Sequence, residues 1–244
     1  MDPRPPSAAA LLMAAGASTR FRRGSSADEP GKPFQRLGDA CVLEHAAAPF
    51  ARLAGVRELV VVARAEDLEL VRRLVQRSPA LARVTAIVEG GATRSDSVRA
   101  GLEVVSPECE LVAVHDAARP LVSAAVVERA LSVAARRGAA LVAVPVRDTI
   151  KTSSSGDAAE GTIDRSVLWA AQTPQVFRAA LLRELFERAA SDDFRPTDES
   201  ALHERYVGPV PLVEGSSDNL KITTPTDLVV AEAILRARTR KGDT

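Results

Sequence analysis

The chain has 244 residues, 46% of them hydrophobic and 26% charged, which is typical of one globular domain with a sizeable core. Its 32 basic residues equal its 32 acidic ones, so no net positive field is present to bind nucleic acid or an anionic membrane. Cys41 and Cys109 are isolated, and the N-terminal apolar run is too short to span a bilayer. We therefore expect a cytoplasmic protein with no nucleic-acid or membrane partner.

Short apolar runs alternate with amphipathic stretches along the first part of the chain. Each run has the length of a strand and is apolar on both faces, as in a sheet that is covered on both sides. The alternation predicts an α/β fold, a single Rossmann-like domain whose mostly parallel sheet has helices on both faces. The expected strands are residues 8–13, 59–63, 84–88, 111–114 and 139–144, and the expected helices are residues 43–53, 66–77, 95–105 and 123–137.

The alternation breaks after Pro145. Residues 146–152 and 161–165 have the pattern of two strands around the polar linker SSSGDAAEG, which predicts a hairpin with a long exposed turn. A floppy surface loop is the alternative, but long loops are often functional, so we expect a projecting β-arm at about residues 146–168.

The remaining segments complete one domain, which we place at residues 7–240, with residues 1–6 and 241–244 as disordered ends. Thr224 before Pro225, with Asp227 three places on, is a helix-capping signature. The expected helices here are residues 179–190, 197–205 and 225–238, and the expected strand is residues 210–213.

The loop after the first expected strand has the composition of a phosphate-binding segment. It begins with Ala14, Ala15 and Gly16, contains Arg20 and continues to Lys32. Small residues let backbone amides approach phosphate oxygens, and the two cations can neutralise a triphosphate. The segment matches neither GxGxxG, nor the P-loop, nor GxSxG. A loop without a function is the alternative for this segment alone.

Gly90 and Gly91 follow the third expected strand, and Ser97 lies in the next helix. Glycines expose backbone groups that can read the edge of a nucleobase. An ordinary turn with a helix cap is the alternative interpretation.

Asp116 follows the fourth expected strand, where a carboxylate beside a phosphate site can hold magnesium. Ala117 leaves room for ribose and phosphates, and Arg119 is expected in the same pocket. His115 is predicted to be structural, because no second His or Cys lies at metal-ligand spacing.

Asp218 and Lys221 follow the last expected strand. Taken singly, they would be solvated surface charges. Because ligands bind where loops leave the carboxyl ends of the strands, four polar loops of this kind predict one shared site.

These segments resemble, in order and nearly end to end, the 2-C-methyl-D-erythritol 4-phosphate cytidylyltransferases of the non-mevalonate isoprenoid pathway. Many ordered matches are specific, whereas any one alone is weak. The matching motifs are AAGASTR at 14–20, GKPF at 31–34, RSDSVRAGL at 94–102, VHDAARP at 114–120, PVRDTIK at 145–151, LWAAQTPQ at 168–175, TDE at 197–199 and EGSSDNLKIT at 214–223.

The resemblance implies attack by the phosphate of methylerythritol phosphate on the α-phosphorus of CTP, with pyrophosphate leaving. It implies Mg²⁺ as cofactor, CTP as co-substrate, and a homodimer in which the arm reaches the partner's site. The implied catalytic residues are Arg20, Lys32, Arg165 and Lys221. The implied nucleotide site is Ala14, Ala15, Gly16, Gly90, Gly91, Ser97, Asp116, Ala117 and Arg119. The implied alcohol-phosphate site is Thr149, Arg165 and Thr173, and the implied metal residues are Asp116 and Asp218. One departure is Ala92, where members often have an acidic residue.

Two rival functions stay open. A cytidylyltransferase for ribitol 5-phosphate shares most of the nucleotide site, although Thr149, Arg165 and the Leu168-Trp169 pair favour methylerythritol phosphate. A non-catalytic nucleotide-binding module would keep the sheet and lose the charges that serve only the transition state.

Overall fold

A computed structural model describes residues 6–16 and 31–241 of the chain. Its central sheet has seven strands: β1 (Ala8–Met13), β4 (Val56–Ala63), β5 (Val84–Glu89), β6 (Leu111–Asp116), β7 (Ala139–Pro145), β10 (Trp169–Arg178) and β11 (Leu212–Glu214). Their order across the sheet is β11-β7-β10-β6-β1-β4-β5. The pairs β1–β4, β1–β6, β4–β5 and β7–β11 are parallel, which confirms the predicted mostly parallel sheet.

Strand β10 is antiparallel to both of its neighbours, β6 and β7, and the apolar pattern of the sequence does not predict it. The segment contains Pro174, which cannot donate a ladder hydrogen bond and argues against a central strand. The structure accommodates the proline within a register shift between Ala171 and Gln175.

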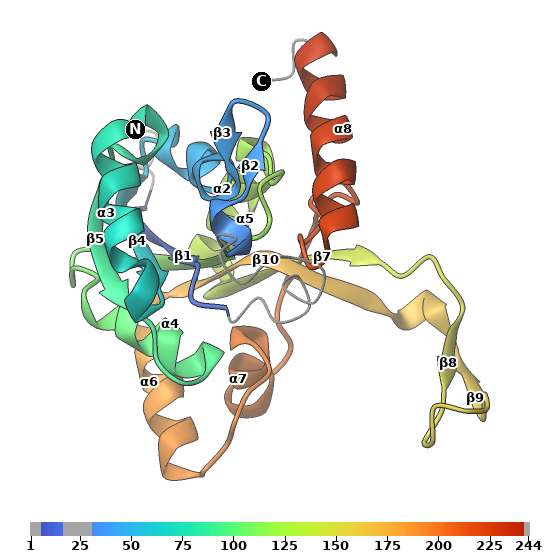
Figure 1. The fold of residues 1–244 in the computed structure, drawn as a ribbon. Helices are drawn as coiled ribbons and strands as arrows, with labels where there is room; N and C mark the ends of the chain where they lie inside the picture. The colour runs from blue at the N-terminus through green and yellow to red at the C-terminus, as the bar shows by residue number, and fades with distance from the viewer. Residues whose placement is uncertain (1–5, 17–30, 242–244) are drawn as a thin grey trace.

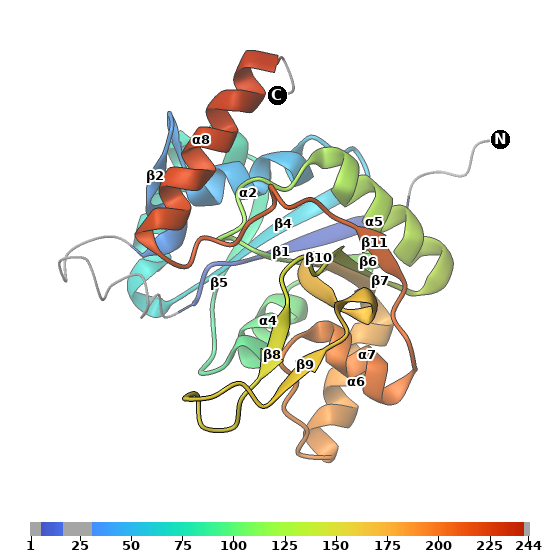
Figure 2. The same ribbon diagram turned by 90° about the vertical axis from the view of Figure 1, so that its right-hand side faces the viewer.

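Helices cover both faces of the sheet, as predicted (Figure 2). On β1, Ala10 and Leu12 belong to the core beneath one set of helices, whereas Ala9 and Leu11 belong to the core beneath the other. This split follows from the alternation of side chains along a strand. The first set is α2 (Val42–Ala51), α3 (Leu68–Arg77) and α5 (Ala124–Arg137), and the second is α4 (Arg94–Glu103), α6 (Ala179–Ser191) and α7 (Glu199–Tyr206).

Helix α8 (Pro225–Lys241) packs through Ala231 on a small separate core that includes Leu37 and Leu121. Its predicted capping signature is confirmed, because the Asp227 carboxylate accepts hydrogen bonds from the backbone amides of Thr223 and Thr224, each at 2.8 Å. Leu37 belongs to a short hairpin, β2 (Arg36–Leu37) and β3 (Ala40–Cys41), that the sequence pattern does not predict. Among the described residues, no helix combines the length and the apolar character needed to cross a bilayer.

Strands β8 (Ile150–Thr152) and β9 (Gly161–Ile163) pair as an antiparallel hairpin, with Ile150 opposite Ile163. The hairpin extends away from the sheet (Figure 1). It lies where the sequence predicts two strands around a polar linker. Val167 and Trp169, at its base, are 72% and 42% exposed.

Candidate active site

A cleft of about 250 Å³ lies at the carboxyl ends of the central strands. The loops after β1, β5, β6 and β11 all contribute to it, together with the short helix η1 (Lys32–Phe34). The convergence of four polar loops, predicted from the sequence, is therefore present. The lining residues are Met13, Ala14, Ala15, Gly16, Lys32, Pro33, Gly91, Ala92, Thr93, Arg94, Ser97, Asp116, Ala118 and Lys221.

The glycine pair after β5 allows the wall of this cleft to form. A Cβ atom on Gly90 would lie 2.6 Å from the Cβ of Ala15, and one on Gly91 would lie 2.4 Å from the Cβ of Asp96. Real Cβ atoms do not approach so closely. Glycine at position 90 therefore lets the loop after β5 pack against the loop after β1, and glycine at position 91 lets it lie close to the first turn of α4.

Thr93 caps helix α4 at this wall. Its hydroxyl accepts a hydrogen bond from the Asp96 amide at 3.1 Å, and the Asp96 carboxylate accepts one from the Thr93 amide at 3.0 Å. The Ser97 hydroxyl donates to the Thr93 carbonyl at 2.9 Å. The capping interpretation of this turn is thus confirmed, with Thr93 as the cap, and the turn also faces the cleft.

Among the described residues, Asp116 is the one carboxylate that lines the cleft. Its Oδ2 lies 2.8 Å from Lys221 Nζ and 3.7 Å from Arg119 Nε, and its Oδ1 lies 3.5 Å from Arg94 Nη2. Burial by itself would raise the pKa of Asp116, but the positive charges of Lys221, Arg94 and Arg119 outweigh it and lower the pKa to about 2. Asp116 is therefore ionised throughout the neutral range.

Arg94, which lines the cleft and is 31% exposed, forms an ion pair with the buried Glu199, and neither is a site residue predicted from the sequence. Arg94 Nη1 lies 2.5 Å from Glu199 Oε1, and Glu199 is only 1% exposed. Burial raises the pKa of Glu199 although Arg94 opposes the shift. Both residues lie within motifs of the family resemblance, RSDSVRAGL and TDE, but their pairing across 105 residues has no local signal.

Thr173 and Ala117 lie behind the cleft surface and do not line it. Thr173 is 4% exposed, and its hydroxyl accepts a hydrogen bond from the Asp116 amide at 3.0 Å. Arg119 links two loops, because its Nη1 donates to the Asn219 carbonyl at 2.7 Å. Thr173 and Arg119 thus hold the backbone of the neighbouring loops without lining the cleft themselves.

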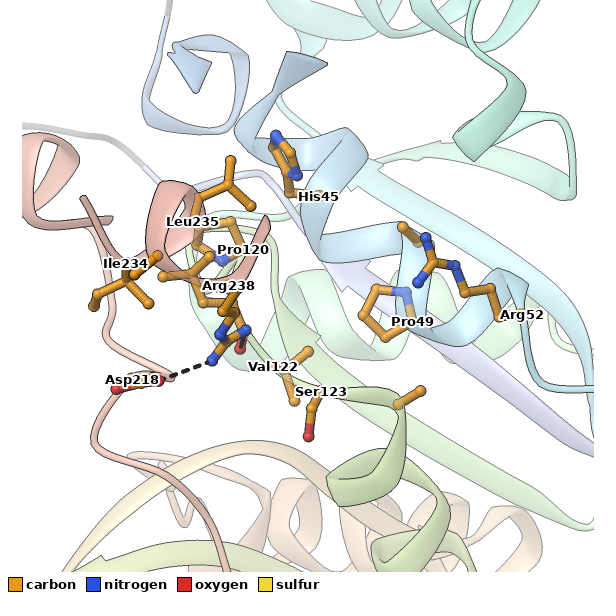
Figure 3. Close-up of a pocket in the computed structure, with 14 residues that line it drawn as sticks. His45, Pro49, Arg52, Pro120, Val122, Ser123, Asp218, Ile234, Leu235 and Arg238 are labelled. Carbon is orange, nitrogen blue, oxygen red and sulfur yellow. Dashed lines mark hydrogen bonds and ion pairs between the residues drawn. The ribbon is translucent and has the colours of Figure 1, made fainter. Parts of the chain in front are cut away.

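Asp218 lies in a different cavity, of about 830 Å³, beneath α8 (Figure 3). Its Oδ2 lies 3.3 Å from Arg238 Nη2, and Arg238 Nη1 also donates to the Leu121 carbonyl at 2.8 Å. Asp218 does not line the cleft that contains Asp116.

Thr149 and Arg165 lie on the arm segment and do not line the cleft of their own chain. The Arg165 guanidinium donates to the carbonyl of Arg147, within the same arm. Arg20 falls outside the described residues, so its assignment stays a prediction.

The part of the chain that the structure describes contains no group of three or more His, Cys, Asp or Glu side chains that could hold a metal ion. Asp116 can still supply one oxygen ligand. Magnesium is commonly bound by one or two carboxylates together with substrate phosphates and water, so a single cleft carboxylate fits a magnesium ion that arrives with a triphosphate.

A mostly parallel α/β sheet, with glycines, two lysines and one carboxylate in a cleft at its carboxyl edge, defines a nucleotide-binding transferase of the nucleotidyltransferase class. The family model described as IspD, 2-C-methyl-D-erythritol 4-phosphate cytidylyltransferase, matches residues 8–237. The chain belongs to this family.

Relatives with that enzyme name match nearly the whole chain. The protein of Solibacter usitatus is 42% identical over 93% of this chain and 95% of the relative. The protein of Symbiobacterium thermophilum is 43% identical over 95% of this chain and 94% of the relative.

Solved structures agree in fold. The Thermus thermophilus enzyme has a TM-score of 0.73 and 35% identity, with 93% of this chain and 98% of that chain covered. The 4-diphosphocytidyl-2C-methyl-D-erythritol synthase of Anaerococcus prevotii has a TM-score of 0.80 and 26% identity, with 96% and 100% covered.

Proposed function

We propose that this protein transfers CMP from CTP to 2-C-methyl-D-erythritol 4-phosphate, giving 4-diphosphocytidyl-2-C-methyl-D-erythritol and pyrophosphate for isoprenoid precursor synthesis. The observation that carries the proposal is the cleft, which is lined by Lys32, Lys221, Asp116 and Gly91 in a chain of this family. A phosphate oxygen of the alcohol phosphate attacks the α-phosphorus of CTP. The bond from that phosphorus to the β-phosphate oxygen breaks, and pyrophosphate carries the electron pair away.

The protein stabilises charge in this reaction and supplies no nucleophile of its own. A five-coordinate phosphorus carries extra negative charge, and fixed cations in a cleft stabilise it without reorganising. We assign this task to Lys32 and Lys221, which line the cleft, and to Arg20, which lies outside the described residues.

The nucleotide is proposed to lie along the wall of the cleft that is formed by the loop with Gly90 and Gly91. The backbone of Ala14, Ala15 and Gly16 would contact the triphosphate. Gly90, Gly91 and Ser97 would read cytosine, chiefly through the backbone. Ala117 and Arg119 would contribute from the loop after β6, where Arg119 is already tied to Asn219.

Magnesium is proposed to bind through Asp116 together with phosphate oxygens. The ion, when bound, neutralises phosphate charge and orients the triphosphate for displacement. Asp218 is not assigned to the metal, because it pairs with Arg238 in the other cavity.

The arm is proposed to complete the site of a partner subunit in a homodimer. Two observations support this: Thr149 and Arg165 do not line their own cleft, and apolar side chains at Ile163, Val167 and Trp169 are exposed on the arm. We propose that Thr149 and Arg165 bind the alcohol phosphate across the interface. Thr173, which the resemblance assigns to the same substrate, would contribute indirectly, because its hydroxyl accepts a hydrogen bond from the Asp116 amide.

The test is pyrophosphate release with CTP, Mg²⁺ and methylerythritol phosphate, run beside ribitol 5-phosphate and beside ATP, GTP and UTP. Release with the first pairing alone supports the proposal. Release with ribitol 5-phosphate keeps the mechanism and changes the substrate, whereas CTP binding without any release favours a binding module. We expect the activity in the cytoplasm, since both substrates are charged metabolites.

A further inference from the structure

His115 is a fully buried histidine one residue before Asp116 on β6. Successive side chains on a strand point to opposite faces, so Asp116 faces the cleft and His115 faces the core beneath α2. There its ring packs against Phe50, with 5.1 Å between the ring centroids. His115 therefore touches no group in the cleft directly.

The hydrogen bonds of His115 define one tautomer. Nε2 lies 3.1 Å from the carbonyl oxygen of Arg119, which can only accept, so Nε2 carries the proton. The Thr173 oxygen also lies 3.0 Å from the Asp116 amide, which can only donate, so the hydroxyl proton is left for Nδ1. The Thr173 hydroxyl, 3.0 Å from Nδ1, must then donate to it.

This donation leaves the Thr173 oxygen free to accept, and it accepts from the Asp116 amide at 3.0 Å. The hydroxyl is thus oriented by His115 and holds the backbone of Asp116. The two ring nitrogens of His115, the Thr173 hydroxyl and the Asp116 amide thus each have a hydrogen-bond partner.

The network also reaches the loop that carries Lys221. Asn219 Nδ2 donates to the Thr173 carbonyl at 3.0 Å, and the Asn219 carbonyl accepts from Arg119. His115 thereby contacts two residues, Thr173 and Arg119, that each bind Asn219. These contacts join the loop after β6, the middle of β10 and the loop after β11.

We propose that His115 is a positioning residue for the transfer reaction, acting through the Thr173 hydroxyl to hold Asp116 against Lys221. The inference rests on the proposed function, because its readout is turnover. A positioning role differs from a packing role in one respect: the loss of the Nδ1 acceptor lowers kcat beyond what the loss of stability explains.

Three variants separate the two roles. His115→Leu removes both hydrogen bonds, His115→Gln keeps a donor near the Nε2 position, and His115→Asn keeps an acceptor near the Nδ1 position. We expect His115→Leu and His115→Gln to lower kcat about tenfold or more, with little change in the KM for CTP, because small displacements of reacting groups are costly. His115→Asn should recover much of that loss.

His203 provides the matched control. It is also a buried histidine, its Nδ1 bonds to the Gly208 carbonyl at 2.9 Å, and it lies on α7 and does not line the cleft. His203→Leu should lower the unfolding temperature in a comparable way and leave kcat near the wild-type value. All variants are assayed well below their own unfolding temperatures.

A double-mutant cycle with Thr173→Val gives the decisive result. If His115 acts through the Thr173 hydroxyl, His115→Leu has little further effect on kcat once that hydroxyl is gone. Equal kcat for His115→Leu and His203→Leu, or full additivity with Thr173→Val, overturns the inference. An inactive wild-type protein would overturn the proposed function instead.

Discussion

The ammonium group of Lys221 lies 2.8 Å from Oδ2 of Asp116 and joins the loop after β11 to the end of β6. Asp116 is buried, whereas the Lys221 side chain is 41% exposed. The buried carboxylate therefore holds the ammonium group of Lys221 at the surface of the cleft. A cation held in place before the substrate arrives needs little reorganisation when charge develops on phosphorus. This ion pair connects strand β6 to the lysine that we propose stabilises the charge on phosphorus.

Replacement of either cleft lysine should affect turnover more than binding. We expect Lys32→Ala and Lys221→Ala each to lower kcat by about 100-fold or more, since each removes charge that matters most in the transition state. Steady-state pyrophosphate release measures this. Arg72→Ala, an equal loss of charge on exposed α3, is the control and should leave kcat unchanged. A lysine variant with near wild-type turnover would refute that residue's role.

A mixing experiment tests whether two chains share a site. Arg165→Ala disables the arm, and Lys221→Ala disables the cleft, so each homodimer should be nearly inactive. Random exchange of subunits makes about half of the dimers mixed, and each mixed dimer has one intact site. Activity should therefore return to about a quarter of the wild-type level. No recovery, with exchange shown by differently tagged subunits, would mean that each chain builds its own site.

Asp116 should make stability depend on pH. Its folded pKa, about 2, lies below the unfolded value, so its contribution is present above about pH 4 and is lost as the pH falls through 2. Asp116→Asn should be less stable than wild type at pH 7, because Lys221, Arg94 and Arg119 lose their shared partner.

The difference in the free energy of unfolding between wild type and Asp116→Asn should narrow by on the order of 2 kcal/mol between pH 4 and pH 2, as measured by urea unfolding. Asp193→Asn, on a side chain that is 93% exposed, is the control and should change little at any pH. A constant difference across the pH range would show that the Asp116 charge does not contribute as proposed.

The space around Gly90 and Gly16 predicts different effects of alanine substitution on stability. Gly90→Ala places a methyl group 2.6 Å from the Ala15 side chain and should destabilise the fold by about 1–3 kcal/mol. A Cβ on Gly16 meets nothing within 4 Å, so Gly16→Ala should stay within about 0.5 kcal/mol of wild type. Thermal unfolding without nucleotide measures both, and equal effects would contradict the packing argument.

The sequence by itself determined the parallel strands of the central sheet and the loops of the site, but not strand β10. Runs such as Ala8–Met13 and Leu111–Asp116 are buried on both faces, so their burial leaves a local apolar signature. The loops after such strands meet at one sheet edge by a general rule of α/β folds, which is why Lys32, Asp116 and Lys221 could be grouped in advance.

Only the tertiary structure decided which partners these residues have. Strand β10 holds Pro174 in a break of register that no local pattern reveals, and Arg94 meets Glu199 because α4 and α7 cover the same face of the sheet. The structure likewise places Asp218 beside Arg238, away from the cleft. The physical reason is that periodicity records how each residue is buried, whereas pairing between distant residues depends on how the completed elements pack.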